Sequence, residues 1–135
     1  NNDFAPTFAD LAGLPPPASV DGRSFASLLD RSQRNDPASW RTAFEIRNWD
    51  NKRNEASYRA VTPVPPSRAV RTHRYLYVEY KAEERELYDL RKDPYELRSL
   101  HDSADKDLIS KLDARLDALR DCAGKGCRTA EDAPP

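Results

Sequence analysis

The strongest constraint on the fold is a set of segments whose side chains alternate at the spacing of β-strands. In "RYLYVEY", residues 74–80, one side carries Tyr75, Tyr77 and Glu79, and the other carries Leu76, Val78 and Tyr80. "RELYDL", residues 85–90, follows after a polar stretch that suits a turn, and "WRTAFEIR", residues 40–47, alternates in the same way. Together with "RAVRT", these segments predict a small antiparallel sheet of three to four strands.

Residues 104–121 carry a helical pattern instead. Apolar residues recur at helical spacing and form one stripe: Leu108, Ile109, Leu112, Leu116 and Leu119. We expect this amphipathic helix to cover one face of the sheet. The predicted fold class is therefore α+β.

The first 35 residues have apolar faces with no visible partner in the sequence. A short helix is expected from Pro6 to a stop at Gly13, and another from Ser24 to Leu29, with the extended "LPPPASV" between them. We expect these helices to pack on something larger, encoded upstream of Asn1.

Composition limits the classes of partner. Hydrophobic residues make up 38% of the 135 residues, with 11 Pro, so the core should be small. The net charge of -1 gives no general attraction to nucleic acid or to an anionic membrane. No apolar run approaches the roughly 18 residues of a membrane span. The chain contains no Met, which suggests a piece of a longer protein.

The junction "RELYDLRKDPYELR", residues 85–98, predicts the start of a short helix at Pro94. Asp93 is a favourable N-cap, Pro94 suits the first helical position, and Glu96 stands three residues after Asp93, as in a capping box. These carboxylates are expected to serve the scaffold rather than acid–base chemistry.

Two cysteines, Cys122 and Cys127, lie in "CAGKGC" directly after the long helix. A local disulfide is the leading interpretation, because the intervening glycines allow so short a loop to close. It indicates an oxidising compartment. Free thiols or half of a zinc site are the alternatives, although His73 and His101 are not at ligand spacing.

Ligand-contacting side chains are predicted in two places. In the loop "RNWDNKRNEASYR", Trp49 could stack on a sugar ring, and the basic residues could meet sulfate or carboxylate groups; these are Arg47, Lys52 and Arg53. The alternative is a solvated loop. In the strand run, Arg71 and His73 could stand at the mouth of a site for an anionic ligand, or His73 could simply be a partly exposed strand histidine. The sequence has no phosphate loop, no nucleophile elbow and no metal-type cluster, so no catalytic and no metal residue is predicted.

The order of several motifs resembles the C-terminal third of the formylglycine-dependent sulfatases, the arylsulfatase family, especially those acting on sulfated sugars. The motifs are "NNDFAPTFADLAGL", "VDGRSFASLL", "FEIR", "RAVRTHRYLYVEY", "RELYDLRKDPYELRSL" and "CAGKGC". The resemblance spans residues 1 to about 128. It implies a four-stranded antiparallel sheet packed by a C-terminal helix, following short helices that close a larger α/β catalytic domain.

The same resemblance implies that the chemistry lies elsewhere. In the family, a C/S-x-P-x-R motif supplies the formylglycine, and a calcium ion lies beside it; neither cysteine of this chain has that context. We therefore expect no cofactor in this segment, and formylglycine and calcium in the parent protein. The expected partners are the upstream catalytic domain and a sulfated carbohydrate.

The resulting interpretation divides the chain into three parts. Residues 1–35 are the end of the catalytic domain and a linker, 36–128 the C-terminal sulfatase subdomain, and 129–135 a loose tail. The segment is expected to support an extracellular, periplasmic or lysosomal sulfatase without turning over substrate alone. The alternatives are a freestanding carbohydrate-binding or interaction module, or the same region of a phosphate or phosphonate ester hydrolase.

Overall fold

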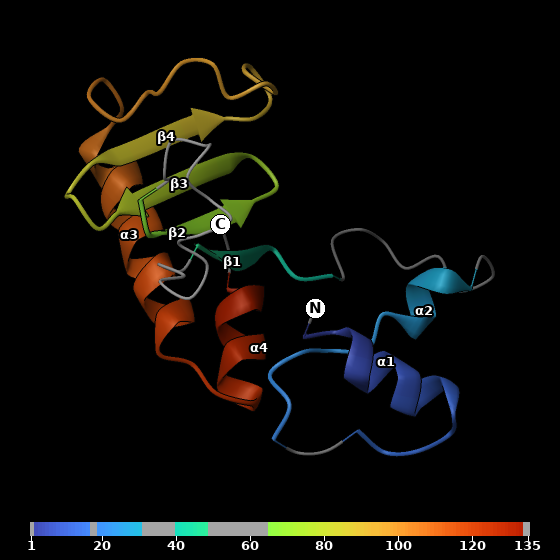
Figure 1. Ribbon diagram of the computed structural model, residues 1–135. Coiled ribbons are helices and arrows are strands. Elements are labelled where there is room, and N and C mark those ends of the chain that lie inside the picture. The colour runs from blue at the N-terminus through green and yellow to red at the C-terminus, as the bar shows by residue number, and fades with distance from the viewer. Residues whose placement is uncertain (1, 17–18, 31–39, 49–64, 134–135) are drawn as a thin grey trace, which may run out of the picture. The chain divides into compact units, whose positions relative to one another are not determined.

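A computed structural model describes residues 2–16, 19–30, 40–48 and 65–133 (Figure 1). These residues form two compact units, one from residues 1–44 and 117–135 and the other from residues 45–116. The elements in chain order are α1 (Phe4–Leu11), α2 (Ala26–Leu29), β1 (Ala43–Asn48), β2 (Ser67–Thr72), β3 (Tyr75–Tyr80), β4 (Arg85–Asp89), α3 (Lys106–Arg120) and α4 (Lys125–Asp132). The α+β class is confirmed. The boundary expected at residue 35 lies outside the described residues.

The strands form one four-stranded sheet in the order β1-β2-β3-β4, with β2, β3 and β4 paired antiparallel. Val70 lies opposite Tyr77, and Tyr77 lies opposite Leu87, so these three buried side chains share one face of the sheet. On the other face, Ala69, Leu76 and Val78 form a second apolar cluster; partly buried Tyr80, Tyr88 and Leu90 pack against it. The side chains that alternate in the sequence therefore do point to the two opposite faces of the sheet, as predicted.

The long helix α3 runs along the sheet, as predicted (Figure 1). Its apolar stripe is buried at Leu112 and Leu116, which are 5% and 1% exposed. Asp113 of α3 interacts with Tyr77 and Glu79 of β3, so the helix covers the sheet face that carries Tyr77. Apolar burial of this kind is the main source of stability for such a pair of layers.

Within the first unit, α1 and α2 pack through aromatic rings. Phe4 meets Phe25 edge to face at 5.6 Å between ring centroids. Gly13, the predicted stop of α1, has φ of +70, a conformation that favours glycine at a helix end. Gly22 is also required, because a Cβ there would collide with the backbone carbonyl of Asn2.

The predicted helix at Pro94 is wrong. The Asp93 carboxylate accepts hydrogen bonds from the backbone N–H groups of Leu97 and Arg98, both at 2.8 Å, which lie beyond the N2 and N3 positions of a capped helix. Glu96 has φ of +57, so the chain leaves the helical region after a single turn. Asp93 therefore organises a compact turn rather than a helix.

The expectation of a loose tail from residue 129 is also wrong for residues up to Asp132, which belong to α4. Glu131 is only 9% exposed, and its backbone carbonyl accepts hydrogen bonds from both the N–H and the hydroxyl of Thr42, each at 2.9 Å. A helix of 8 residues is shorter than the stretch of chain over which a helical repeat can be read with certainty, so the sequence pattern did not reveal it.

Candidate functional site

The predicted ligand-contacting residues fall at opposite ends of β2. Arg71 lies near the end of β2 and His73 in the turn that follows it, whereas Arg47 lies on β1 beside the start of β2. Trp49, Lys52 and Arg53 lie outside the described residues. The structure therefore places Arg71 and His73 at one end of β2 and Arg47 at the other.

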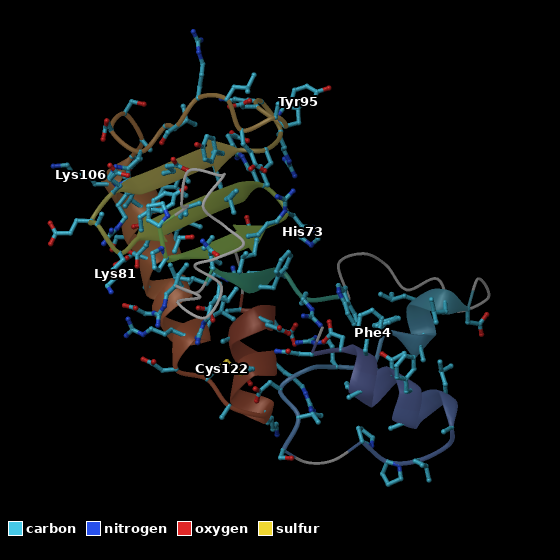
Figure 2. All side chains as sticks on the ribbon, in the orientation of Figure 1. Phe4, His73, Lys81, Tyr95, Lys106 and Cys122 are labelled. Carbon is cyan, nitrogen blue, oxygen red and sulfur yellow. A yellow bond between two sulfur atoms is a disulfide. The ribbon has the colours of Figure 1, made fainter. Side chains whose placement is uncertain are left out.

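The turn between β2 and β3 is built by Thr72. Its hydroxyl accepts the backbone N–H groups of Arg74 at 3.2 Å and Tyr75 at 2.8 Å, which holds the chain in a tight reversal. His73 stands at the tip of this turn and is exposed (Figure 2). A fixed turn that presents an exposed imidazole is suited to contacting a ligand or a neighbouring domain.

Arg74 ties the tip to the end of β4. Its Nη2 lies 2.9 Å from Oδ2 of Asp89, a side chain that is otherwise buried, and its guanidinium stacks on the ring of Tyr75 at 4.8 Å. The hydrogen bond from Arg74 lowers the pKa of Asp89. This pair fixes the tip without using His73.

Arg71 contributes a second link at the same end of the sheet. Its Nη1 lies 3.3 Å from Oε1 of Glu96, in the turn that follows β4. The carboxylate of Glu96 thus pairs with Arg71 instead of capping a helix, which was the role predicted from the sequence. Both side chains are about 40% exposed, so the pair is weak and Arg71 stays accessible.

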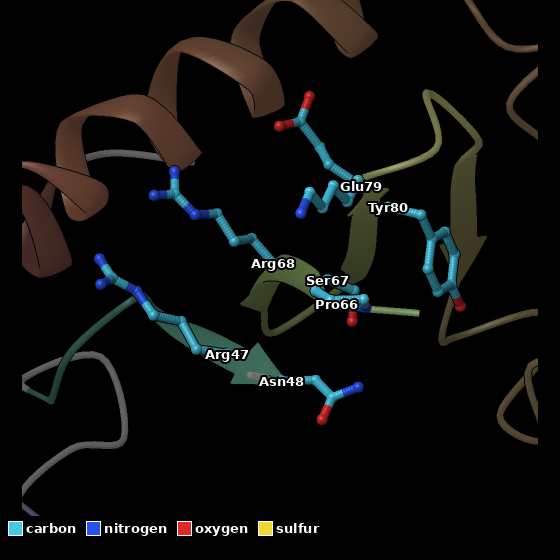
Figure 3. Close-up of a pocket in the computed structure, with 8 residues that line it drawn as sticks. Arg47, Asn48, Pro66, Ser67, Arg68, Glu79 and Tyr80 are labelled. Atoms are coloured by element: carbon cyan, nitrogen blue, oxygen red, sulfur yellow. The ribbon is translucent and has the colours of Figure 1, made fainter. Parts of the chain in front are cut away.

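A hollow of about 290 Å³ lies at the other end of β2 (Figure 3). Its lining residues come from β1, β2, β3 and the turn after β3, and they are Arg47, Asn48, Pro66, Ser67, Arg68, Glu79, Tyr80 and Lys81. Figure 3 shows Arg47 and Arg68 extending side by side from neighbouring strands. Only Arg47 was predicted from the sequence. Arg68 and Lys81 belong to strand ends, where a basic residue is ordinary, so no pattern marked them.

Glu79, the one carboxylate in that lining, is already engaged. Its Oε1 lies 2.9 Å from Nε of Arg85 and accepts the hydroxyl of Tyr77 at 3.3 Å. Burial raises the pKa of Glu79, and a hydrogen bond with Asp113 adds to the effect. Burial and the charge of Glu79 also raise the pKa of Tyr77 to about 12, so its hydroxyl remains a donor. Glu79 therefore holds β3, β4 and α3 together.

The first unit contains a partly buried charge cluster that the sequence did not predict. The two carboxylate oxygens of Glu131 form ion pairs with the guanidinium groups of Arg23 and Arg41, each at an N–O distance of 3.0 Å. Arg41 also forms an ion pair with the carboxylate of Asp3 at 2.7 Å. Both guanidiniums stack on the ring of Trp40, at 5.6 and 5.0 Å. Burial raises the pKa of Glu131, while the charges of Arg41 and Arg23 oppose that shift.

This cluster explains two of the sequence motifs. Asp3 and Arg23 belong to the segments "NNDFAPT" and "VDGRS". Arg23 reaches Glu131 of α4 across 108 residues of chain, and Asp3 pairs with Arg41, which also binds Glu131. Such long-range pairs leave no local signal. Each of these charged side chains has an oppositely charged partner within the unit. We therefore interpret the cluster as structural rather than catalytic.

The predicted disulfide is confirmed: Cys122 and Cys127 are bonded, with their Cα atoms 4.8 Å apart. Within the described residues, no group of three or more His, Cys, Asp or Glu side chains is placed to hold a metal ion. None of the described helices is long and apolar enough to cross a membrane.

Comparison with known proteins defines the class. Residues 1–122 match the family described as N-sulphoglucosamine sulphohydrolase, C-terminal. The chain is 28% identical over 128 residues to an N-acetylglucosamine-6-O-sulfatase of Bacteroides thetaiotaomicron, covering 90% of this chain and 22% of that protein. The fold and sequence are thus those of the C-terminal region of a sulfatase.

Solved structures agree. The structure of a protein in complex with its substrate D-glucosamine-2-N,6-O-disulfate superposes with a TM-score of 0.73 and 26% identity, over 98% of this chain and 25% of that one. A phosphonate monoester hydrolase of Agrobacterium radiobacter gives a TM-score of 0.61 and 29% identity, over 87% and 24%. The chain spans about a quarter of these proteins. It belongs to the N-sulphoglucosamine sulphohydrolase C-terminal family.

Proposed function

We propose that this chain is the C-terminal portion of an active sulfuric ester hydrolase, and that it supports an upstream catalytic domain and frames the substrate cleft. The observation that carries the proposal is the family match over residues 1–122, combined with coverage of about a quarter of each relative. Formylglycine and calcium would be supplied by the upstream domain. The disulfide supports an extracellular, periplasmic or lysosomal location.

The surface of the first unit supports an upstream partner. Large apolar side chains of α1, α2 and the segment after α1 are 45% to 64% exposed, and they are Phe4, Phe8, Leu11, Leu14, Leu28 and Leu29. A group of this size on two adjoining helices is costly to leave in water, and it marks an interaction surface. This surface argues against the alternative of a freestanding module.

Substrate contact is proposed for the two predicted places. Arg71 and His73 would face an anionic group from the turn between β2 and β3. Arg47, Trp49, Lys52 and Arg53 would do so from β1 and the residues that follow it. The exposure of His73 and the accessibility of Arg71 support the first set.

The test is hydrolysis by the native protein that contains residues 1–135. We expect release of inorganic sulfate from N-acetylglucosamine 6-sulfate, measured by ion chromatography, and a mass decrease at the motif cysteine or serine that corresponds to formylglycine. A protein with the modification that released no sulfate from this sugar or from an aryl sulfate would contradict the proposal.

A second function, hydrolysis of phosphate or phosphonate monoesters, is favoured by the likeness to the phosphonate monoester hydrolase. The same preparation assayed with a phenyl phosphonate ester separates the two. Faster turnover of the phosphonate than of the sulfate esters would favour this alternative.

A further inference from the structure

The sequence of α4 does not favour a helix by itself. The helix spans 8 residues, has no side-chain hydrogen bond at its N-cap and contains Gly126 in its first turn. Its charges also oppose the helix dipole, because Lys125 stands at the positive N-terminal end while Glu131 and Asp132 stand at the negative C-terminal end. We therefore expect α4 to be helical only while other segments of the chain hold it.

The contacts that hold α4 are mainly polar. Its two buried side chains are Cys127 and Glu131, and only Cys127 is apolar. Ion pairs join Arg23 to Glu131 at 3.0 Å and to Asp132 at 2.9 Å. The hydroxyl of Thr42 donates to the backbone carbonyl of Glu131 at 2.9 Å. Because such bonds are directional, they form only when the helix is correctly placed.

The disulfide supplies that placement. Cys122 follows the end of α3 by two residues, and Cys127 lies in the first turn of α4. The bond between them closes a loop with a sequence separation of 5. Inside this loop, the N–H of Gly124 bonds to Asp21 at 2.7 Å, which aligns the loop with the segment that carries Arg23.

We infer that Cys122 and Cys127 form a redox switch that controls the docking of α4. The disulfide holds α4 against the first unit, and the dithiol releases it. Closing the switch takes two electrons and two protons from the thiols, and these reduce the disulfide of an oxidant, such as an oxidoreductase or oxidised glutathione. The first unit is then completed only in an oxidising compartment. This inference goes beyond the proposed function, because it does not depend on which ester the protein hydrolyses.

The switch reaches the start of the chain through two arginines. The backbone N–H of Arg23 bonds to Oδ1 of Asp3 at 2.9 Å, and Arg41 pairs with both Asp3 and Glu131. Asp3 directly precedes α1. Release of α4 therefore takes Glu131 away from the two residues that hold Asp3, and it loosens the entry to α1.

A switch of this kind has a reciprocal property. Docking of α4 and formation of the disulfide are linked equilibria, so each favours the other by the same free energy. A substitution that weakens the docking of α4 must therefore make the disulfide easier to reduce, even where the substituted residue lies far from both cysteines in the sequence. A disulfide that is not coupled to docking shows no such effect.

The experiment places the native protein that contains residues 1–135 in graded mixtures of reduced and oxidised glutathione. Alkylation followed by peptide mass spectrometry measures the fraction of Cys122 and Cys127 present as thiols. Arg23→Gln and Glu131→Gln should each lower the equilibrium constant for disulfide formation about tenfold, which is a usual strength of coupling between two sites.

The matched control is Arg85→Gln, which makes the same change of charge and breaks an ion pair of similar length, 2.9 Å to Glu79, in the second unit. Its equilibrium constant should stay close to that of the wild type. Thr42→Val keeps every charge and removes one hydroxyl contact with Glu131, so it should lower the constant about threefold. It decides the question if a charge variant loses amide protection in β3 and so fails to fold.

Hydrogen exchange of the wild-type protein gives a second readout. Reduction should speed exchange throughout α4 and at the N–H groups of Arg23 and Thr42, which bond to Asp3 and Glu131, and it should leave β3 unchanged. Equal protection of α4 in the two redox states would overturn the inference. An equilibrium constant that is the same in the wild type and in all the variants that weaken docking would also overturn it.

Discussion

At the scale of single residues, the environment of Glu79 makes the stability of the fold depend on pH. It meets Arg85 and Tyr77 on the sheet and Asp113 on α3, and burial raises its pKa above the usual value of 4.5. A carboxyl whose pKa is higher in the folded state holds its proton more tightly there. Its contribution to stability is therefore full at acidic pH and is lost as the pH rises from about 4.5 through the raised pKa.

Glu79→Gln should remove this dependence, because an amide keeps a hydrogen bond to Asp113 but does not titrate. We expect the free energy of unfolding of the variant, relative to the wild type, to rise between pH 4 and pH 7. Urea unfolding at several pH values measures it. A relative stability that falls over this interval would show that the ion pair with Arg85 outweighs the cost of burial.

At the scale of elements, the disulfide between Cys122 and Cys127 restrains the start of α4. It closes a loop with a sequence separation of 5, and Gly124 inside the loop donates its N–H to Asp21 at 2.7 Å. For so short a loop, the chain-entropy model gives a stabilisation of about 2 kcal/mol. Because Glu131 lies on the same helix, loosening α4 also loosens the charge cluster with Arg23 and Arg41.

The double variant Cys122→Ser, Cys127→Ser should lose about 2 kcal/mol of unfolding free energy. Hydrogen exchange should localise the loss to α4, with little change in β3. The wild type measured with and without reductant is the control, and the reduced wild type should match the variant. Equal loss of protection in β3 and α4 would show that the disulfide acts on the whole domain.

The elements also show what the sequence could predict. The strands β2, β3 and β4 and the helix α3 were predicted because repeated alternation or a long apolar stripe reports burial directly. The prediction of a helix at Pro94 was wrong because the backbone of Glu96 adopts a left-handed conformation, which no local sequence pattern indicates. The helix α4 was missed because its anchor is the long-range contact between Glu131 and Thr42.

For the molecule as a whole, the candidate sites were predictable only in part. The turn that carries Arg71 and His73 follows from two adjacent strands, so local reasoning placed both residues at one end of the sheet. The hollow around Arg47 and Arg68 depends on β1 lying beside β2, and the intervening chain gives no sign of that pairing. Sequence patterns thus report burial along each element better than they report which elements meet.

The exposed apolar surface of α1 permits a test of whether the whole protein is larger than this chain. Phe8 and Leu11 are 64% and 62% exposed, so Phe8→Ser and Leu11→Ser should change the unfolding free energy of the isolated 135 residues by no more than about 0.5 kcal/mol. If the upstream domain covers these side chains, each substitution should cost about 2 to 5 kcal/mol in the native protein, as for buried apolar residues. Denaturant unfolding of both forms measures the difference, and equal effects in the two forms would show that this surface remains open to solvent.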